Sequence, residues 1–379
     1  MNIYLDYAAT TPLDPEVLDA MLPAFHEGFA NPSSLHQPGQ TARRMIETAR
    51  EQVAAAIGAT PREITFTSGA TEADNHALRA VAAARPHGHI LTSQLEHSAV
   101  LATSRFLEQQ GHNVTYLRSN AQGEITPDAV AAKLGPDTAL VALMLVNNET
   151  GIITDIPAIS QLAHEAGALV FCDAVQAFGT LPLDVHALDV DLLSLSAHKI
   201  HGPKGAGALY IRNGLELGPF LLGGEQERGR RAGTQNTPAI AGMGKAAELA
   251  AAFRQQTAQE VGMLRDRLQA KLLEIEGVSL NGGEAPRGPK HLNVRVRGVD
   301  GEALLIGLDQ AGVSASAGSA CAAGTLEPSH VLLAMGLRED EARSSLRFSL
   351  GRGLRETDID EAAQRFAEVV WRCRAFAPH

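Results

Sequence analysis

Short β-rich runs alternate with alanine-rich helical segments between about residues 60 and 212, and this alternation constrains the fold more than any other feature. Runs of β-branched and aromatic residues bounded by turn residues are typical of buried strands. Seven strands are expected, at residues 64–67, 89–93, 114–117, 139–146, 168–173, 192–197 and 208–211. The pattern predicts an α/β fold with a mostly parallel seven-stranded sheet covered by helices. Ligands of such sheets bind beyond the carboxyl ends of the strands.

The C-terminal third has a different pattern. A long helical stretch over about residues 239–276 precedes a Gly/Pro-rich turn at 281–289, a strand at 292–296 and a helix at 302–311. A chain of 379 residues has room for two domains. We therefore expect a large domain over residues 13–255, and a smaller α+β domain formed by residues 1–12 with 256–379.

Composition and charge exclude several classes of function. Apolar residues make up 45% of the chain and charged residues 20%, which is ordinary for a soluble globular protein. The formal net charge of −11 opposes direct nucleic-acid binding, because neutralising phosphates needs a basic surface. Neither a run of about 18 apolar residues nor a signal-peptide pattern occurs, so we expect no membrane span and no secretion.

The three cysteines are Cys172, Cys321 and Cys373. They are too few and too far apart for a disulfide framework or a Cys-x-x-Cys zinc site, so a reducing cytoplasm and no intrinsic metal are expected. Cys321 lies among Gly, Ser and Ala in a segment over about residues 314–328. Such neighbours favour a mobile loop, which suits a nucleophile that must reach two partners. The alternative is a buried small hydrophobe, and that is our interpretation of Cys172 and Cys373.

Lys199 follows a predicted buried strand and precedes a Gly-Pro-Lys-Gly turn at residues 202–205. Its small neighbours leave room for a flat ring, and desolvation would keep its amine neutral and nucleophilic, as a Schiff-base lysine requires. Asp173 ends another apolar strand 26 residues upstream. A buried carboxylate needs a positive partner, which a pyridinium nitrogen supplies. Taken alone, Asp173 can also be a turn residue or a helix cap.

A third signal lies at the transition from a predicted strand to a helix at residues 66–75. The backbone amide of Ala70 and the hydroxyl of Thr71 can hold a phosphate at such a helix start. The same segment also fits a plain capping box of the type Ser/Thr-x-x-Glu.

Together these segments resemble the fold-type-I pyridoxal-phosphate enzymes, and specifically the class V aminotransferase-like group that contains the cysteine desulfurases. The resemblance covers essentially the whole chain in one order. Its further motifs are LDYAATT at 5–11, NPSSLH at 31–36, EH at 96–97, VNNETG at 146–151, ERGRRAGT at 227–234, SAGSAC at 316–321 and RFSLGR at 347–352.

The resemblance implies a fold-type-I transferase, pyridoxal 5′-phosphate as the cofactor, and a homodimer. The catalytic residues it implies are Lys199, Cys321 and His97. The implied cofactor contacts come from Ala70, Thr71, His97, Asn148, Asp173, Gln176, Ser196, His198 and Lys199, with Thr234 arriving from the partner subunit. The implied substrate contacts are Arg347 and Asn148, with Asn31 and His36 at the entrance.

The implied activity converts L-cysteine into L-alanine and places the sulfur on Cys321 as a persulfide. The sulfur then passes to an acceptor protein of iron–sulfur cluster assembly or tRNA thiolation. The SAGSAC segment is similar to the group I (NifS/IscS-like) loop, although residues 322–324 (AAG) are less polar than usual. The sequence ends soon after Arg374, without the extended tail with which IscS-type enzymes dock a scaffold. Cys321 could transiently share an iron–sulfur cluster with a scaffold protein, and whether this chain has such a partner therefore stays open.

Other activities stay open. Selenocysteine lyases, cysteine-sulfinate desulfinases and small aminotransferases share the expected fold, and a protein that only relays persulfide belongs to a different class. A nicotinamide dehydrogenase is disfavoured, because no Gly-x-Gly-x-x-Gly follows a strand.

Overall fold

The structure is a computed structural model that describes residues 2–318 and 327–375. A seven-stranded sheet forms its centre, in the order β2-β8-β7-β6-β5-β3-β4. Five neighbouring strands are parallel, whereas β8 is antiparallel to both β7 and β2. The strands are β2 (Ile64–Thr67), β3 (His89–Ser93), β4 (Val114–Leu117), β5 (Thr138–Met144), β6 (Leu169–Asp173), β7 (Leu192–Ser196) and β8 (Gly207–Ile211). The expected α/β fold with a mostly parallel sheet is confirmed.

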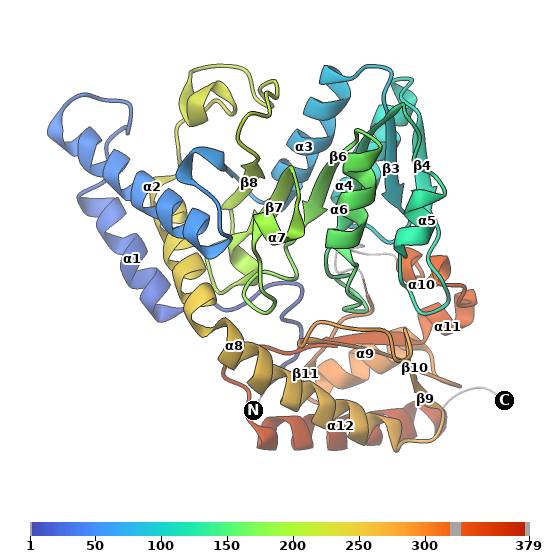
Figure 1. Cartoon of the computed structure of the whole chain (residues 1–379). Coiled ribbons are helices and arrows are strands. Elements are labelled where there is room, and N and C mark those ends of the chain that lie inside the picture. The colour runs from blue at the N-terminus through green and yellow to red at the C-terminus, as the bar shows by residue number, and fades with distance from the viewer. Residues whose placement is uncertain (1, 319–326, 376–379) are drawn as a thin grey trace.

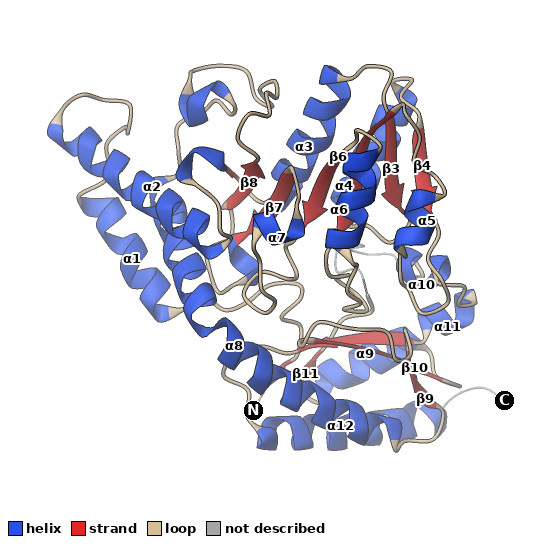
Figure 2. Cartoon of the chain, in the orientation of Figure 1, coloured by secondary structure: helices blue, strands red, loops and turns tan. Residues whose placement is uncertain are grey.

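Helices cover both faces of this sheet (Figures 1 and 2). They are α1 (Pro15–His26), α2 (Gln37–Ala56), α3 (Ala70–Ala84), α4 (Ser98–Gln109), α5 (Pro127–Ala131), α6 (Ile156–Glu165), α7 (Val185–Leu188) and α8 (Thr237–Leu273). Strand β5 shows why two layers form: Leu140 and Ala142 join the core under α3 and α4, while Val141 and Leu143 join the core under α6. Successive side chains of a strand point to opposite faces, so a strand buried on both sides is apolar throughout.

A second group of elements packs below the large sheet in Figure 1. Its strands are β1 (Ile3–Tyr4), β9 (Val278–Leu280), β10 (His291–Val296), β11 (Val313–Ser314) and β12 (Ser345–Ser349). Its helices are α9 (Gly301–Gln310), α10 (His330–Ala334), α11 (Glu339–Arg343) and α12 (Glu356–Ala375). The order β12-β10-β9 is antiparallel, and β1 pairs with β11 in parallel.

Helix α8 connects the two groups without interruption. Met243 and Ala246 near its start belong to the core of the large sheet, whereas Val261 and Leu268 belong to the core that also contains Leu5. The division at residues 12 and 255 stays a prediction. No helix in the described part of the chain is long and apolar enough to span a membrane.

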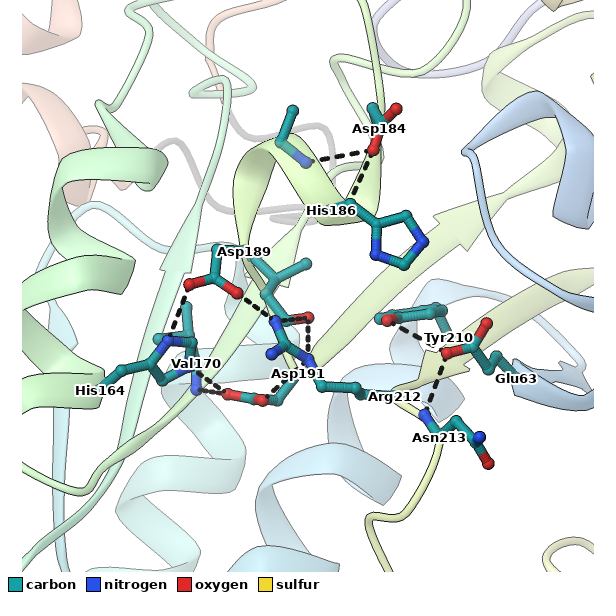
Figure 3. A network of polar contacts seen from close by, with 12 residues as sticks. Glu63, His164, Val170, Asp184, His186, Asp189, Asp191, Tyr210, Arg212 and Asn213 are labelled. Atoms are coloured by element: carbon teal, nitrogen blue, oxygen red, sulfur yellow. Dashed lines mark hydrogen bonds and ion pairs between the residues drawn. The ribbon is translucent and has the colours of Figure 1, made fainter.

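A polar network closes the amino ends of β6 and β7 (Figure 3). Asp191 accepts a hydrogen bond from the backbone of Val170 at 2.8 Å and contacts His164 at 2.8 Å. Arg212, just after β8, donates to Asp189 and to the carbonyl of Val190. This end of the sheet is held by structural contacts, and the opposite end, where the parallel strands finish, is left for a ligand.

Candidate active site

A cavity of about 520 Å³ lies at the carboxyl ends of β5, β6 and β7. Its walls come from the residues that follow these strands, from the N-terminal segment 8–10, from the start of α3 and from β12. The predicted residues that line it are Ala70, Thr71, His97, Asn148, Asp173, Gln176, Ser196, His198, Lys199 and Arg347. Residues distant in the sequence therefore converge on one space.

Lys199 lies in a short 3₁₀ turn directly after β7. Its Nζ atom donates hydrogen bonds to the carbonyl oxygens of Ala8 and Ala9, both at 2.7 Å. Strand β7 ends at Ser196, one residue earlier than expected, because residues 197–199 enter this turn. The turn places the amine in the cavity wall beside the small N-terminal residues.

Asp173 ends β6 and is buried, with its Oδ1 accepting from the backbone N–H of Val175 at 3.0 Å. Burial raises the pKa of its carboxyl, and His97 and Lys199 oppose that change. Asp74 on α3 lines the same cavity, and both its oxygens are buried without a hydrogen-bond partner among the described residues. Burial and Asp173 raise the pKa of Asp74 well above its usual value. Burial therefore dominates at this end of the cavity, and a further positive charge there would stabilise the ionised carboxyl of Asp173.

His97 caps the start of α4. Its Nδ1 accepts a hydrogen bond from the backbone N–H of Ala99 at 3.2 Å. Burial lowers the pKa of the ring, so the neutral form is favoured. A neutral ring whose Nδ1 accepts carries its proton on Nε2. His97 is therefore a hydrogen-bond donor through Nε2.

The start of α3 forms another wall of the cavity. Gly69 is its N-cap, and no side chain caps the helix there. A Cβ atom at Gly69 would meet no other atom within 4 Å, so the space above this turn is open. Glu72 accepts from the backbone N–H of Ser68 at 2.9 Å, but Ser68 precedes the N-cap Gly69, so this contact is not that of a capping box. The exposed N–H groups of the first helical turn are suited to an anion.

Arg347 on β12 is almost fully buried at the other end of the cavity. One terminal nitrogen lies 2.7 Å from Oδ1 of Asp6, and the other donates to the carbonyl oxygen of Asn148 at 2.9 Å. Its Nε atom and Oδ1 of Asn148 are buried without partners among the described residues. These two unpaired atoms are one donor and one acceptor available to a ligand.

Three predicted residues do not line this cavity. Asn31 accepts from the backbone of Ser33, and His36 caps α2 through the N–H of Gly39. Thr234 is exposed on the loop before α8. Cys321 lies outside the described residues, as does most of the segment that carries it.

Two ionisable residues that line the cavity, Lys204 and Asp74, were not among the predicted site residues. Lys204 lies in the Gly-Pro-Lys-Gly turn, whose position directly after Lys199 was a usable signal. Asp74 lies on the same face of α3 as the buried residues Ala77, Leu78 and Val81, so helical spacing marked it as a buried carboxylate. Both residues could therefore have been predicted from the sequence.

The cavity fits pyridoxal phosphate. Asp173 needs a cation and is suited to the ring nitrogen, Lys199 supplies an amine, and the uncapped start of α3 is suited to the phosphate. Arg347 Nε and Asn148 Oδ1 remain for an amino-acid substrate.

Comparisons with known proteins agree with this geometry. The family model "Aminotransferase class-V" matches residues 3–361. "Cysteine desulfurase" from Trichormus azollae is 47% identical over 378 residues, covering 99% of this chain and 94% of that protein. "Cysteine desulfurase IscS" from Methanosarcina thermophila is 46% identical, with the same coverage. A solved structure described as a NifS-like protein has a TM-score of 0.92 at 35% identity, covering 98% of this chain and 100% of that one. Another, described as SspA in complex with cysteine, has a TM-score of 0.83 at 38% identity, covering 93% of this chain and 99% of that one.

Proposed function

This chain belongs to the class-V aminotransferase family, among the cysteine desulfurases, and on that premise we propose that it converts L-cysteine into L-alanine and passes the sulfur to Cys321 as a persulfide. The observation that carries the proposal is the convergence of Lys199, Asp173 and Arg347 on one cavity. An amine, a buried carboxyl group and a carboxylate-binding guanidinium are what a pyridoxal-phosphate enzyme acting on an amino acid needs.

Lys199 would hold the cofactor covalently, and Asp173 would pair with its ring nitrogen. Ala70, Thr71, Ser196 and His198 would surround the phosphate; the donor-rich start of α3 and the position of all four residues in the wall of one cavity support this assignment. Thr234 of the partner subunit would complete the phosphate site. When bound, pyridoxal phosphate withdraws electrons from the attached amino acid, which weakens its Cα–H bond and then its Cβ–S bond.

The residues of the chain perform the remaining tasks. Arg347 and Asn148 orient the substrate carboxylate and amino group. Lys199, as a neutral amine, takes the Cα proton. Asp173 would stay ionised beside the ring nitrogen, because the positive charge of that nitrogen offsets the free-energy cost of burying the carboxylate.

The thiolate of Cys321 attacks the sulfur of the bound cysteine. A new S–S bond forms to Cys321 while the Cβ–S bond breaks, and its electron pair stays with the carbon skeleton, which takes up a proton and leaves as alanine. We assign His97 as a hydrogen-bond donor to the bound cofactor or substrate through Nε2, because the N–H of Ala99 occupies Nδ1.

We also propose that two copies form a homodimer in the cytoplasm. Large apolar side chains are exposed on and near α1 and on the loop before α8: Leu22, Phe25, Phe29, Leu35, Leu221 and Leu222. Exposed apolar groups of this kind mark interaction surfaces. The same loop carries Thr234. The proposed acceptor of the sulfur is a protein of iron–sulfur cluster assembly or tRNA thiolation that docks near Cys321.

A substrate comparison tests the activity. Purified enzyme is given L-cysteine, L-selenocysteine or L-cysteine sulfinate, and alanine is measured with each. A cysteine desulfurase releases alanine from cysteine, and Cys321→Ser abolishes that reaction. If only selenocysteine or the sulfinate yields alanine, and Cys321→Ser has no effect, the chain is a lyase or desulfinase of the same fold.

A further inference from the structure

His291 is the first residue of β10 and is completely buried beside the cavity. Its Nε2 atom lies 3.3 Å from Oε1 of Gln176, a residue that lines the cavity. Its Nδ1 atom is buried and has no hydrogen-bond partner among the described residues. Within residues 2–318 and 327–375, the one polar contact of the ring is therefore with Gln176.

The orientation of the Gln176 amide follows from its other neighbour. Nε2 of Gln176 lies 3.0 Å from the carbonyl oxygen of Ala8, which can only accept a hydrogen bond. The amide nitrogen must therefore be on that side, and Oε1 must face His291. An amide oxygen only accepts, so His291 must donate through Nε2.

The protonation state that burial favours for His291 is the neutral ring, which agrees with donation through Nε2. Burial lowers the pKa of His291 well below its usual value, and Lys290, Arg347, Arg265 and Lys199 act in the same direction. Neutral histidine carries one proton, which the contact with Gln176 places on Nε2. The unpaired atom is then the Nδ1 lone pair, which costs less than a buried unpaired N–H group.

We propose that His291 is a positioning residue: it fixes the Gln176 amide so that an N–H group, and not an oxygen lone pair, is presented to the cofactor. One Nε2 hydrogen of Gln176 is donated to Ala8, and the second remains for an acceptor in the cavity. This inference rests on the proposed function, and it adds to it that the acceptor is the phenolate oxygen of the ring. The carbonyl of Ala8 also accepts from Lys199 at 2.7 Å, so the fixed amide lies next to the amine that holds the cofactor.

The first test needs no cofactor and no activity. Cofactor-free enzyme with nitrogen-15 in its histidines is studied by two-bond hydrogen–nitrogen NMR correlation, and His291→Gln identifies the signals of residue 291. The expected ring is neutral with its proton on Nε2, from mildly acid to mildly alkaline pH. A proton on Nδ1, or a charged ring, would overturn the proposal.

The second test uses the visible band of the Lys199-bound cofactor. A donor to the phenolate oxygen lowers the basicity of the nitrogen that joins Lys199 to the cofactor. In His291→Leu the Gln176 amide is held by Ala8 alone and its second N–H is less firmly aimed at the phenolate oxygen, so the pH midpoint of the band should rise by about half a unit or more. His291→Gln, whose amide can donate from nearly the same position, should restore the wild-type midpoint.

A double variant shows whether His291 acts through Gln176. In a Gln176→Leu background, His291→Leu should not shift the midpoint further. An unchanged midpoint in His291→Leu, or an equal shift in both backgrounds, would refute the positioning role. If wild-type protein forms no visible band, the proposed function fails instead, and the NMR result still decides the state of His291.

Discussion

Asp6 and Arg347 form a partly buried ion pair in which a carboxylate oxygen lies 2.7 Å from the guanidinium, although 341 residues separate them in the sequence. The pair joins the N-terminal segment to β12, and the carbonyl of Asn148 accepts from the same guanidinium. Only 2% of the Arg347 side chain is exposed, so water scarcely reaches the guanidinium. Asp6 supplies its negative partner until a substrate carboxylate binds.

We expect Asp6→Asn to destabilise the enzyme and to make its stability depend more strongly on a bound carboxylate. Asparagine keeps an acceptor but removes the charge, so the free energy of unfolding should fall by about 1–3 kcal/mol. Thermal denaturation with and without L-alanine measures this, and the ligand should raise the melting temperature more in the variant than in the wild type. Asp340→Asn, which removes the partner of the exposed Arg338, is the control and should change neither value. Equal responses to alanine in Asp6→Asn and wild type would contradict the role of Asp6.

Glu227→Gln should loosen the loop that carries Thr234. Glu227 and Arg50 form a buried bidentate pair with distances of 2.7 and 3.0 Å. The backbone at Glu227 and Arg228 is left-handed, at φ 47° and 59°, and such conformations persist only where surrounding contacts hold them.

The expected loss is about 2–4 kcal/mol of unfolding free energy, with weaker binding of pyridoxal phosphate, measured by urea denaturation and by cofactor titration. Glu47→Gln removes the half-exposed second partner of Arg50 and should cost less than about 1 kcal/mol. Cofactor affinity that is equal in the two variants would show that the buried pair does not position the loop.

Glu96 should make the cofactor-free enzyme less stable as the pH rises. Oε1 of Glu96 accepts from Ser93 at 2.6 Å, and Oε2 is buried without a partner among the described residues. Burial and Asp173 raise the pKa of this carboxyl from 4.5 to about 8. The folded protein therefore binds this proton more tightly than the unfolded chain does. The stabilisation is complete below about pH 4.5 and is lost as the pH rises to about 8.

Glu96→Gln cannot titrate, so between about pH 5 and 8 its unfolding free energy should fall less than that of the wild type, by a few kcal/mol. Urea denaturation at the two pH values measures the difference. Glu63→Gln is the control, because hydrogen bonds from Thr60 and Asn213 lower the pKa of Glu63 despite its burial, so that it does not titrate in this range. Parallel pH profiles of Glu96→Gln and wild type would be incompatible with a proton held on Glu96.

Lys199→Ala should purify without a visible cofactor band, and its turnover of cysteine should fall at least about a hundredfold, because it loses both the covalent attachment and the proton acceptor. Absorbance before and after borohydride, together with alanine release, provides the measurement. Lys245→Ala, which removes a surface lysine paired with Glu248, should keep both the band and the activity. Retained turnover in colourless Lys199→Ala protein would remove Lys199 from the chemistry.

Local patterns in the sequence were enough to predict the central sheet, through the alternation of strands and helices. The rule that ligands lie beyond strand ends directed attention to Asp173 and Lys199, which the structure brings to one cavity. The pairing of Asp6 with Arg347 and the contact of His291 with Gln176 were not predictable, because each joins segments more than a hundred residues apart whose local sequence carries no sign of the other. The antiparallel β8 was missed for the same reason, since strand direction depends on the path of the chain between strands.

The central claim is that Cys321 takes the sulfur of L-cysteine, and mass spectrometry of the peptide containing Cys321 tests it most directly. Wild-type holoenzyme treated with cysteine should carry one additional sulfur atom on that peptide, removable by a thiol reductant and accompanied by alanine. Lys199→Ala treated in the same way should carry none, and the peptides with Cys172 and Cys373 should remain unmodified in both. Alanine formation with an unmodified Cys321 peptide, or the same sulfur addition in Lys199→Ala, would contradict the account.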